Sequence, residues 1–402
     1  MKIAIVHDWL TAPGGAEKVL EQILQVWPDA DLYTVVDFMS EADRAFLKGK
    51  AVRTTFIQNL PKAKTHYRNY LPLMPIAIEQ LDLSQYQLVI SSSYAVAKGV
   101  ITGPDTTHVC YCHSPVRYGW DLQHQYLKES GLESGIKSIA ARSLLHYLRM
   151  WDVRTAFGVD LFIANSHFTA RRIKKAYGRN SITIYPPVQA LEMPLVQAKQ
   201  EYYVSVSRIV PYKRMDLMAS AFSKMPDKKL ILIGDGPDID KVRAKASSNV
   251  QVLGKQPWDK VIDYMSNAKA FVFAAEEDFG IAPLEAQACG TPIIGYGRGG
   301  LLETTIPVTA PYPTAVYFLE QTEDALIAAV NNFEAVPPDT FKAASIRSHA
   351  LQFDRKAFRA KMKKAVEMAM SKKDGRQAPG LQERRKSALP DITDRWDVDL
   401  SV

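Results

Sequence analysis

Short apolar runs alternate with longer amphipathic stretches along the chain, and this alternation occurs in both halves. A short apolar run between turn residues predicts a buried strand, whereas apolar positions three or four residues apart predict a helix. In the first half the predicted strands are 3–6, 31–36, 87–91, 108–112, 160–164 and 182–185. In the second half they are 203–207, 230–233, 250–253, 270–273 and 292–295.

Helical patterns fall between several of these strands, which is typical of a doubly wound parallel sheet. The predicted fold class is therefore α/β, with two Rossmann-like domains that face each other across a binding cleft. Pro186-Pro187 ends the first pattern, and the polar stretch up to Gln200 is the expected linker. The predicted divisions are a first domain at 1–188, a linker at 189–200, a second domain at 201–353, an amphipathic helix at 354–370 and a flexible polar tail at 371–402.

The composition is that of a soluble globular protein with two domains, since 47% of the 402 residues are hydrophobic and 23% are charged. No apolar run approaches the roughly 18 residues that cross a bilayer, and Met1-Lys2-Ile3 leads into a strand instead of a signal peptide. We therefore expect a cytoplasmic protein. The formal charge of +7 favours anionic partners, but basic and acidic residues are interspersed, which argues against nucleic-acid binding.

Two of the three cysteines lie in the segment Cys110-Tyr111-Cys112-His113. A metal site there is conceivable. However, a buried strand explains the same residues better, and no second Cys/His pair completes a set of four ligands. We expect neither a metal nor a cofactor.

The stretch 268–290 organises the second half. Its apolar part, 268–273, predicts a buried strand, and 281–289 predicts a helix with Pro283 in the first turn. Gly290 would close that helix in a left-handed conformation.

The loop before this helix carries acidic residues and a glycine. Backbone amides at Phe279, Gly280 and Ile281 would lie at a helix N-terminus, where they can bind an anion. Glu277 on the loop and Glu285 in the helix can face one crevice at the carboxyl end of the strand. A catalytic or binding role and simple solvation of acidic helix-start residues explain this pattern about equally well.

In the first domain, Gly14-Gly15 lets a ligand approach a helix N-terminus, although the dinucleotide pattern Gly-x-Gly-x-x-Gly is absent and a plain turn is as good an explanation. His113 follows another strand and can donate to a sugar hydroxyl or a phosphate. Its neighbours Arg117, Tyr118 and Trp120 offer a cation and aromatic faces. A structural histidine and an ion-paired arginine are the alternatives.

In the second domain, Arg208 and Lys213 follow the first strand and can grip a diphosphate, the arginine as a fork and the lysine as a point charge. A solvated basic loop is the alternative. The glycine-containing turns at 233–237 and 299–303 are expected to be architectural. With Glu285 available for ribose hydroxyls, these residues predict sugar transfer in which side chains neutralise a departing diphosphate.

Glu277 and Glu285, with Phe279-Gly280 between them, resemble the Glu-(seven residues)-Glu signature of retaining family 4 glycosyltransferases of the GT-B fold. Arg208 and Lys213 match the diphosphate pair of that family. The segments 165–169 and 185–188 are similar to those that lead into its interdomain linker, so the resemblance covers most of residues 1–370. The runs 113–118 and 211–214 are most similar to bacterial polysaccharide and O-antigen mannosyltransferases that use GDP-mannose.

The resemblance implies a role for each matched residue. The implied catalytic residues are His113, near the reacting carbon, and Glu277. The implied donor residues are Arg208, Lys213 and Gly15 for the diphosphate, Glu285 for the ribose, and Glu277, Phe279, Gly280 and Ile281 for the sugar. The implied acceptor residues are Arg117, Tyr118 and Trp120. The resemblance also implies retention of configuration without a metal, and a helix from Asp354 that crosses back onto the first domain.

The acceptor is expected to be a glycan or a lipid-linked glycan bound by the first domain. Basic and apolar residues are interleaved in 48–73, a mixture that suits peripheral contact with an anionic membrane at its inner face. An ordinary basic surface over a core is the alternative. The residues are Lys48, Lys50, Arg53, Lys62, Lys64 and Arg68 with Phe56, Leu60, Tyr67, Tyr70, Leu71 and Leu73.

Other functions remain open. The donor could carry uridine instead of guanosine, and a nucleotide-sugar epimerase or phosphorylase fits a similar scaffold. A non-catalytic nucleotide-sugar binding protein is a further alternative, although the cation pair and both glutamates argue against it. A nicotinamide dehydrogenase is poorly supported because the glycine fingerprint is missing.

Overall fold

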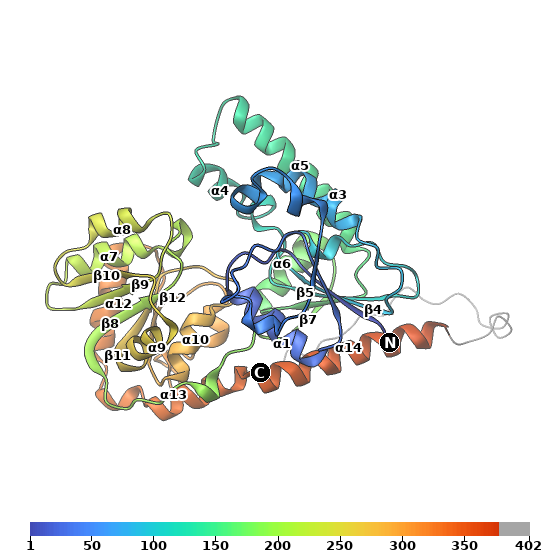
Figure 1. The fold of residues 1–402 in the computed structure, drawn as a ribbon. Coiled ribbons are helices and arrows are strands. Elements are labelled where there is room, and N and C mark those ends of the chain that lie inside the picture. The colour runs from blue at the N-terminus through green and yellow to red at the C-terminus, as the bar shows by residue number, and fades with distance from the viewer. Residues whose placement is uncertain (378–402) are drawn as a thin grey trace, which may run out of the picture.

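Two parallel sheets, one in each half of the chain, form the framework of the protein (Figure 1). The computed structural model describes residues 1–377. The first sheet contains, in spatial order, β3 (Val52–Thr54), β2 (Asp31–Thr34), β1 (Ile3–His7), β4 (Leu88–Ser93), β5 (Thr107–Cys112), β6 (Leu161–Ala164) and β7 (Ser181–Thr183). The second contains β10 (Val250–Gly254), β9 (Leu230–Ile233), β8 (Gln200–Val206), β11 (Ala268–Phe273), β12 (Ile293–Tyr296) and β13 (Ala315–Phe318). The predicted α/β class with two Rossmann-like domains is confirmed.

Helices cover both faces of each sheet. They are α1 (Gly15–Val26), α2 (Ala63–His66), α3 (Met74–Glu79), α4 (Gln123–Glu129), α5 (Ile136–Ala156), α6 (His167–Tyr177), α7 (Met215–Ser223), α8 (Ile239–Lys245), α9 (Trp258–Asn267), α10 (Ile281–Ala288), α11 (Leu301–Thr304), α12 (Glu323–Ala335), α13 (Ala343–Ala350) and α14 (Arg355–Gln377). On the first sheet, α1 and α14 pack on one face, and α3, α5 and α6 pack on the other. On the second sheet, α7 and α12 lie opposite α9 and α10. Burial on both faces explains why the strands are continuous apolar runs.

The chain crosses between the domains twice, and the two crossings lie side by side. The N–H of Val188 donates to the carbonyl oxygen of Phe353 at 2.9 Å, and Val188 also forms a parallel bridge with Asp354. Helix α14 then runs along the lower side of the first domain in Figure 1 and packs on it through Phe358 and Met362. The predicted return of the C-terminal helix to the first domain is confirmed.

The predicted end of that helix at residue 370 is wrong, because α14 continues to Gln377. Polar residues beyond Met370 show no apolar periodicity, but Lys373 still anchors the helix by an ion pair with Asp160 at 3.5 Å. The rest of the predicted flexible tail, 378–402, lies outside the described residues.

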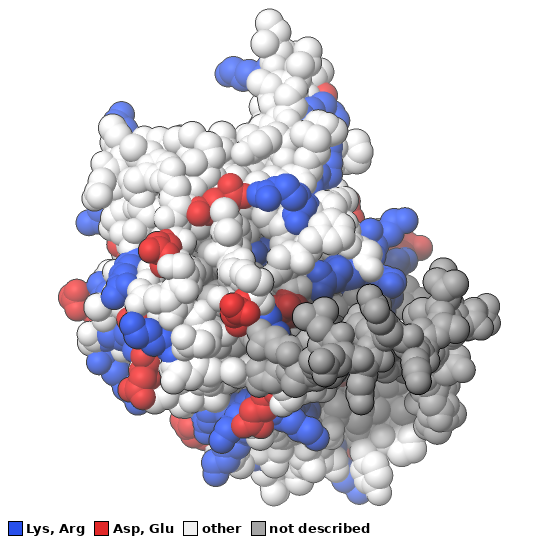
Figure 2. All heavy atoms as spheres, turned by 90° about the vertical axis from the view of Figure 1, so that its right-hand side faces the viewer, with Lys and Arg blue, Asp and Glu red and all other residues white. Residues whose placement is uncertain are grey.

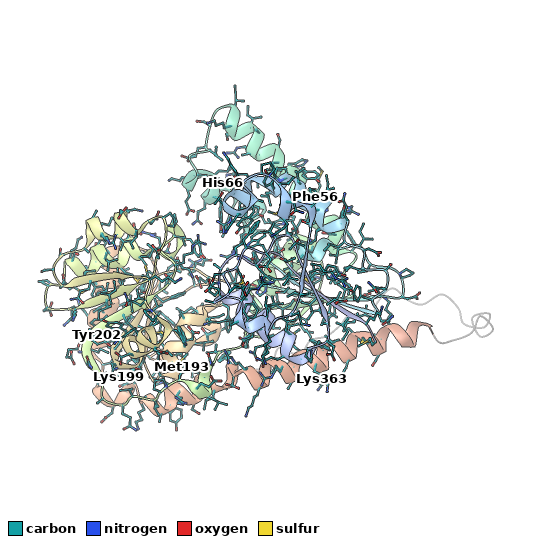
Figure 3. The ribbon with its side chains drawn as sticks, viewed as in Figure 1. Phe56, His66, Met193, Lys199, Tyr202 and Lys363 are labelled. Carbon is teal, nitrogen blue, oxygen red and sulfur yellow. The ribbon has the colours of Figure 1, made fainter. Side chains whose placement is uncertain are left out.

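A lysine anchors the segment between the domains to the second sheet. The ammonium of Lys199 donates to the carbonyl oxygen of Ser266 at 2.7 Å and to Oγ1 of Thr291 at 2.9 Å. Burial lowers the pKa of Lys199 to about 8. Figure 3 labels Lys199 near Met193 and Tyr202, where the chain enters the second domain.

In each sheet the order of the strands reverses between two central neighbours, β1 and β4 in the first sheet and β8 and β11 in the second. Ligands of open α/β sheets bind beyond the carboxyl ends of the strands at such a reversal. The loops after β1, β8 and β11 carry Gly15, Arg208 with Lys213, and Glu277. The topology therefore gathers the predicted site residues at the two reversal points.

Candidate active site

A glycine pair holds the loop between β11 and α10. The N–H of Gly300 donates to the carbonyl oxygen of Glu277 at 2.8 Å. A Cβ atom at Gly299 would lie 2.4 Å from that oxygen, and one at Gly300 would lie 2.3 Å from the carbonyl oxygen of Asp278. Only glycine allows this close approach, so the turn at 299–303 positions the loop that carries Glu277.

The structure brings a predicted diphosphate residue and a predicted sugar residue into contact. Nζ of Lys213 forms an ion pair with Oε1 of Glu277, and each side chain is 15% exposed. Burial, reinforced by the positive charge of Arg117, lowers the pKa of Lys213 to about 7. The ring of Tyr212 lies beside these cations, 5.6 Å from the guanidinium of Arg117 and 5.2 Å from the ammonium of Lys213.

Arg208 is exposed and forms no ion pair with the side chains that the structure describes. Its backbone is nevertheless held tightly by the turn after β9. Cβ atoms at Gly234 and Gly236 would lie 1.8 Å from the carbonyl oxygen of Ser207 and 2.1 Å from that of Ile209. Arg208 is thus presented on a fixed backbone with its guanidinium free for a ligand.

Helix α10 meets the first domain through two of the predicted donor residues. Glu285 is 5% exposed, and its carboxylate forms an ion pair with Lys18 of α1. One turn earlier on α1, a Cβ atom at Gly15 would lie 3.1 Å from Cδ1 of Ile281. The predicted ribose residue and the predicted diphosphate glycine therefore lie at the same domain boundary.

The side chain of Phe279 points away from this boundary. Its ring is 3% exposed and stacks on Tyr185 with centroids 5.6 Å apart, within the apolar cluster formed where the chain crosses between the domains. Gly280, with φ of 90°, then starts α10. Because the phenyl ring is buried, only the backbone of Phe279 is available for a ligand.

Asp278 connects the two domains, and sequence reasoning missed it. Its carboxylate is 6% exposed and pairs with Arg117 at 3.0 Å and with Arg172, both from the first domain. Arg117, a predicted acceptor residue, is thereby ion-paired. The contact places the segment that contains His113 beside the loop that contains Glu277. The only signal for Asp278 in the sequence was its place in an acidic loop.

Glu303 forms a second link between the domains that the sequence did not reveal. Its two carboxylate oxygens accept the N–H groups of His167 and Phe168, each at 2.7 Å. These amides begin α6, where the helix dipole favours a negative charge. The partners are separated by 136 and 135 residues, so no local pattern could predict the contact.

In the first domain a buried polar chain leads from α1 to His113. Oγ of Ser92 lies 2.9 Å from Nε2 of His113 and 3.1 Å from Nδ1 of His7, and Nε2 of His7 lies 3.5 Å from Oε1 of Glu17. Burial, with His7 close by, lowers the pKa of His113 to about 3, so this imidazole is neutral near pH 7. His7 and Ser92 were not singled out because each directly follows a predicted strand, and Glu17 was not because it lies within a helical pattern.

The carboxylate of Asp8 fixes the loop that follows β4. It accepts four backbone N–H groups, from Tyr94, Ala95, Val96 and Ala97, at 2.6–2.9 Å. Asp8 is fully buried. It therefore ties the ends of β1 and β4 together at the reversal point.

Two predicted acceptor residues are engaged inside the first domain. The indole N–H of Trp120 donates to Asp152 at 2.8 Å. Tyr118 packs against Tyr126, with ring centroids 6.0 Å apart, and against the apolar cluster between α4 and α5. Of the three predicted acceptor residues, only Arg117 contacts the other domain.

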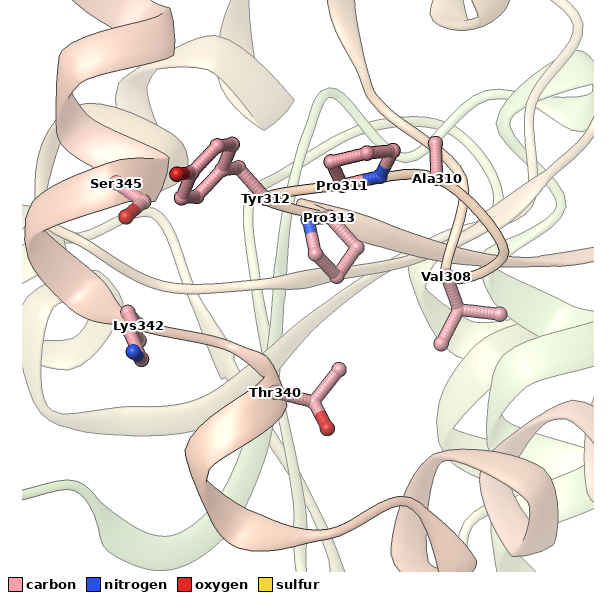
Figure 4. A pocket seen from close by; sticks show the side chains of 8 residues that line it. All are labelled: Val308, Ala310, Pro311, Tyr312, Pro313, Thr340, Lys342 and Ser345. Atoms are coloured by element: carbon pink, nitrogen blue, oxygen red, sulfur yellow. The ribbon is translucent and has the colours of Figure 1, made fainter.

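A cavity of about 270 Å³ lies elsewhere on the second domain (Figure 4). None of the predicted site residues lines it. The lining residues are Val308, Ala310, Pro311, Tyr312, Pro313, Thr340, Lys342 and Ser345.

Within residues 1–377, no three His, Cys, Asp or Glu side chains gather in a way that could hold a metal ion. Over the same range, no helix combines the length and the apolar character needed to cross a membrane.

The chemistry available at the boundary is electrostatic. Arg208 and Lys213 can neutralise a phosphorylated leaving group, Glu277 and Glu285 can accept hydrogen bonds from hydroxyls, and His113 is a neutral imidazole. The site supplies hydrogen bonds and charges instead of an activated thiol, since Cys110, Cys112 and Cys289 are all buried.

Two family models together cover most of the chain. The model described as "Glycosyltransferase Family 4" matches residues 13–190, and the model described as "Glycosyl transferases group 1" matches residues 192–345. The two matches meet at the segment between the domains.

Curated relatives are similar at low identity. A GDP-mannose-dependent monoacylated alpha-(1-6)-phosphatidylinositol monomannoside mannosyltransferase of Corynebacterium glutamicum is 28% identical over 38% of this chain and 48% of that protein. A GDP-Man:Man(3)GlcNAc(2)-PP-Dol alpha-1,2-mannosyltransferase of Xenopus laevis is 24% identical over 87% of this chain and 82% of that protein. The chain spans less than half the length of the first relatives that it matches.

The fold has solved neighbours. Anabaena Alr3699/HepE, crystallised in complex with UDP, aligns with a TM-score of 0.64 over 92% of this chain and 100% of that chain, at 19% identity. At this identity the likeness shows the fold alone.

Proposed function

Since the chain belongs to the family 4 glycosyltransferases with the GT-B fold, we propose that it transfers mannose from GDP-mannose to a glycan or lipid-linked acceptor in polysaccharide biosynthesis. The donor would bind between the two domains, with its diphosphate on Arg208 and Lys213, near Gly15. Its ribose would bind Glu285. Its sugar would bind Glu277 and the backbone amides at 279–281.

The observation that carries this proposal is the ion pair between Arg117 and Asp278 at 3.0 Å. It links the segment of His113 in the first domain to the loop of Glu277 in the second. A sugar attached to a diphosphate on Lys213 would therefore have both predicted catalytic residues beside it.

We propose that the transfer retains the anomeric configuration and needs no metal. Arg208 and Lys213 supply two cations, which can balance the charge of a departing nucleoside diphosphate. The leaving phosphate oxygen would help to take the proton of the acceptor hydroxyl on the same face of the sugar. Glu277 would bind sugar hydroxyls, and His113 would contact the sugar near the reacting carbon.

Mannose and guanosine are supported by the names of the relatives, since those from C. glutamicum and X. laevis both include GDP-mannose or GDP-Man and mannosyltransferase. The UDP bound to Alr3699/HepE keeps a UDP-sugar as the alternative donor.

A thermal-shift panel of GDP-mannose, GDP-glucose, UDP-glucose and ADP-glucose tests the donor, because a ligand that binds only the folded protein raises its Tm. We expect the largest shift with GDP-mannose and a reduced shift in Lys213→Ala. A larger shift with UDP-glucose would replace guanosine by uridine. Conversion of GDP-mannose to another nucleotide sugar without acceptor would indicate an epimerase instead.

The proposed acceptors include lipid-linked glycans, and one surface of the first domain fits a membrane. Of the interleaved residues in 48–73, most apolar members serve the core: Tyr67 is buried, and Leu60, Tyr70 and Leu71 pack against it. Lys50 donates to the carbonyl oxygens of Pro28 and Ala30. That segment therefore offers less free apolar surface than its sequence indicates. Phe56 and Leu73 remain exposed, and Phe56 lies near the top of the first domain (Figure 3).

Helix α5 provides the apolar face that the segment lacks. Its inner face packs on the domain, while large apolar side chains on its outer face are exposed at helical spacing. The only acidic residue within α5 is the buried Asp152, whereas the helix has four basic residues. Figure 2 shows the projection at the top of the molecule as largely uncharged, with both basic and acidic side chains at its margins. The exposed apolar residues along and just after α5 are Ile136, Ile139, Tyr147, Met150 and Phe157.

A cationic helix with an exposed apolar face is typical of a membrane-surface contact, so we propose that α5 rests on anionic lipid. Flotation with vesicles that contain anionic lipid should recover the wild type and lose Ile139→Asp. Ile101→Asp is the matched control. Ile101 lies outside α5, and its side chain is 60% exposed, close to the 66% of Ile139. Equal flotation of all three proteins contradicts the proposal. If the wild type is a dimer and Ile139→Asp is a monomer, the exposed face of α5 binds a second copy of the protein instead.

A further inference from the structure

The hydrogen bonds that link Glu17, His7, Ser92 and His113 can be donated in only one direction when both histidines are neutral. Each neutral imidazole carries one N–H and one bare nitrogen, and a serine hydroxyl donates once. The carboxylate of Glu17 only accepts, so the proton of His7 must sit on Nε2, which lies 3.5 Å from Oε1 of Glu17. The bare Nδ1 of His7 then accepts from the hydroxyl of Ser92 at 3.1 Å.

The same reasoning fixes the donor of the hydrogen bond between Ser92 and His113. Because Ser92 has donated its only proton to His7, its oxygen must accept from Nε2–H of His113, 2.9 Å away. Nδ1 of His113 is then bare. It forms no hydrogen bond with the residues that the structure describes, and it is not among their buried polar atoms without a partner. Since His113 is partly exposed, this nitrogen can meet a ligand.

We propose that Glu17, His7 and Ser92 are positioning residues, which hold His113 as its Nε2–H tautomer so that Nδ1 accepts a hydrogen bond from a sugar hydroxyl. This inference rests on the proposed function, which places a sugar at His113. It also decides between the two partners that the sequence left open. A bare Nδ1 is repelled by a phosphate oxygen and attracted by a hydroxyl proton.

The rings around His113 keep the arrangement in place. Tyr111 and Tyr94 contact the imidazole edge-on, with centroids 5.1 and 5.9 Å away. His7 and Ser92 are fully buried, so water does not compete for the hydrogen bonds between them. His7 and Ser92 thus act on the reaction only through the orientation and tautomer of His113.

The protein contains a matched control in Ser91, the residue before Ser92. Ser91 Oγ lies 2.8 Å from Nε2 of His108, which gives a buried serine–histidine pair between β4 and β5. His108 lies at the opposite end of β5 from His113. Ser91→Ala therefore removes an equivalent hydrogen bond without touching the chain that ends at His113.

The first test is the tautomer itself, read from long-range proton–nitrogen spectra of protein labelled with ¹⁵N-histidine at pH 8, where a histidine of ordinary pKa is neutral. His113→Gln assigns the signal. We expect the Nε2–H form in the wild type and a growing Nδ1–H fraction in Glu17→Gln, whose amide can donate to His7 and reverse the chain. An Nδ1–H tautomer in the wild type overturns the proposal.

The second test is kinetic. We expect Ser92→Ala and Glu17→Gln to lower kcat for sugar transfer about tenfold, the value of one hydrogen bond, with KM changed less than twofold. Ser91→Ala should leave kcat unchanged. An unchanged kcat in both chain variants, or an equal loss in Ser91→Ala, overturns the proposal. Glu17→Gln keeps the test decisive if Ser92→Ala does not fold. If no donor supports transfer by the wild type, the proposed function fails, while the tautomer still decides the direction of the chain.

Discussion

Two lysine–carboxylate pairs, one in each domain, are built for different tasks. Lys98 and Asp152 in the first domain are 2% and 1% exposed, and Nζ of Lys98 lies 2.7 Å from Oδ1 of Asp152. Lys98 also donates to the carbonyl oxygen of Asp152 at 2.7 Å and to Thr155 at 2.8 Å. Trp120 and Tyr177 donate to the other carboxylate oxygen.

The pair in the second domain lacks such an enclosure. Lys213 and Glu277 are each 15% exposed, and the pKa of Lys213 is lowered to about 7 by burial and by Arg117. A buried pair that is surrounded by further hydrogen-bond partners holds a domain together, whereas a partly open pair beside other charges can exchange its partner for a ligand. The presence of these surrounding hydrogen bonds, more than burial alone, separates structure from function here.

The largest effect that separates the two pairs is expected from Lys213→Ala. Loss of this cation removes charge stabilisation from the departing diphosphate, so kcat/KM for transfer should fall about 10²–10³-fold. The Tm should change by less than about 4 °C, since the pair is partly open. Steady-state kinetics and thermal unfolding measure the two quantities. Lys224→Ala, which breaks the exposed pair with Glu323, is the control. A large loss of stability with full activity per folded molecule would contradict the assignment.

The opposite result is expected for Lys98→Met. The unbranched methionine fills similar space but leaves Asp152 buried without its cation, so the free energy of unfolding should drop by about 3 kcal/mol. Denaturant unfolding at pH 7 measures this loss. Lys224→Met provides the exposed reference, for which we expect less than about 1 kcal/mol. If both substitutions cost the same, the enclosure around Lys98 contributes nothing.

A smaller effect concerns pH. The pKa of Lys213 is lowered from its usual range to about 7, so the charged form predominates below pH 7 and is lost as the pH rises through the pKa. Affinity for a nucleoside diphosphate should therefore weaken between pH 7 and pH 9, by at most about tenfold per pH unit. Titration calorimetry at several pH values measures it. Lys213→Arg, which stays charged, should flatten the curve, and an equally steep curve in that variant would assign the titration to another group.

The smallest effect is expected between the domains, from Asp278→Asn. The substitution keeps the shape but removes the carboxylate that pairs with Arg117 and Arg172. Because both arginines are partly exposed, the expected cost is about 1 kcal/mol. Hydrogen exchange at the start of α10 should become faster, while exchange in β4 and β5 stays the same. Asp259→Asn, at the start of α9, is the control, and unchanged exchange in α10 would show that Asp278 does not hold the domains together.

Sequence reasoning succeeded where the signal was local. The apolar runs of β1 and β9 and the helix start with Pro283 follow from short-range periodicity and backbone chemistry. It missed β3, β13 and α5, because edge strands are short and a helix that is apolar on two faces has no clear period. The bounds of the second domain and the roles of the site residues stay predictions.

What the sequence determined by itself was the two-sheet architecture and the kinds of charge at its loops, since both depend on residues close together in the chain. The tertiary structure alone decided which lysine is enclosed and which is open. It also decided that Glu303 caps a helix 135 residues away and that Ser92 joins His7 to His113. The physical reason is that burial and hydrogen-bond partners come from segments far apart in the chain, whose contacts exist only after the sheets have formed.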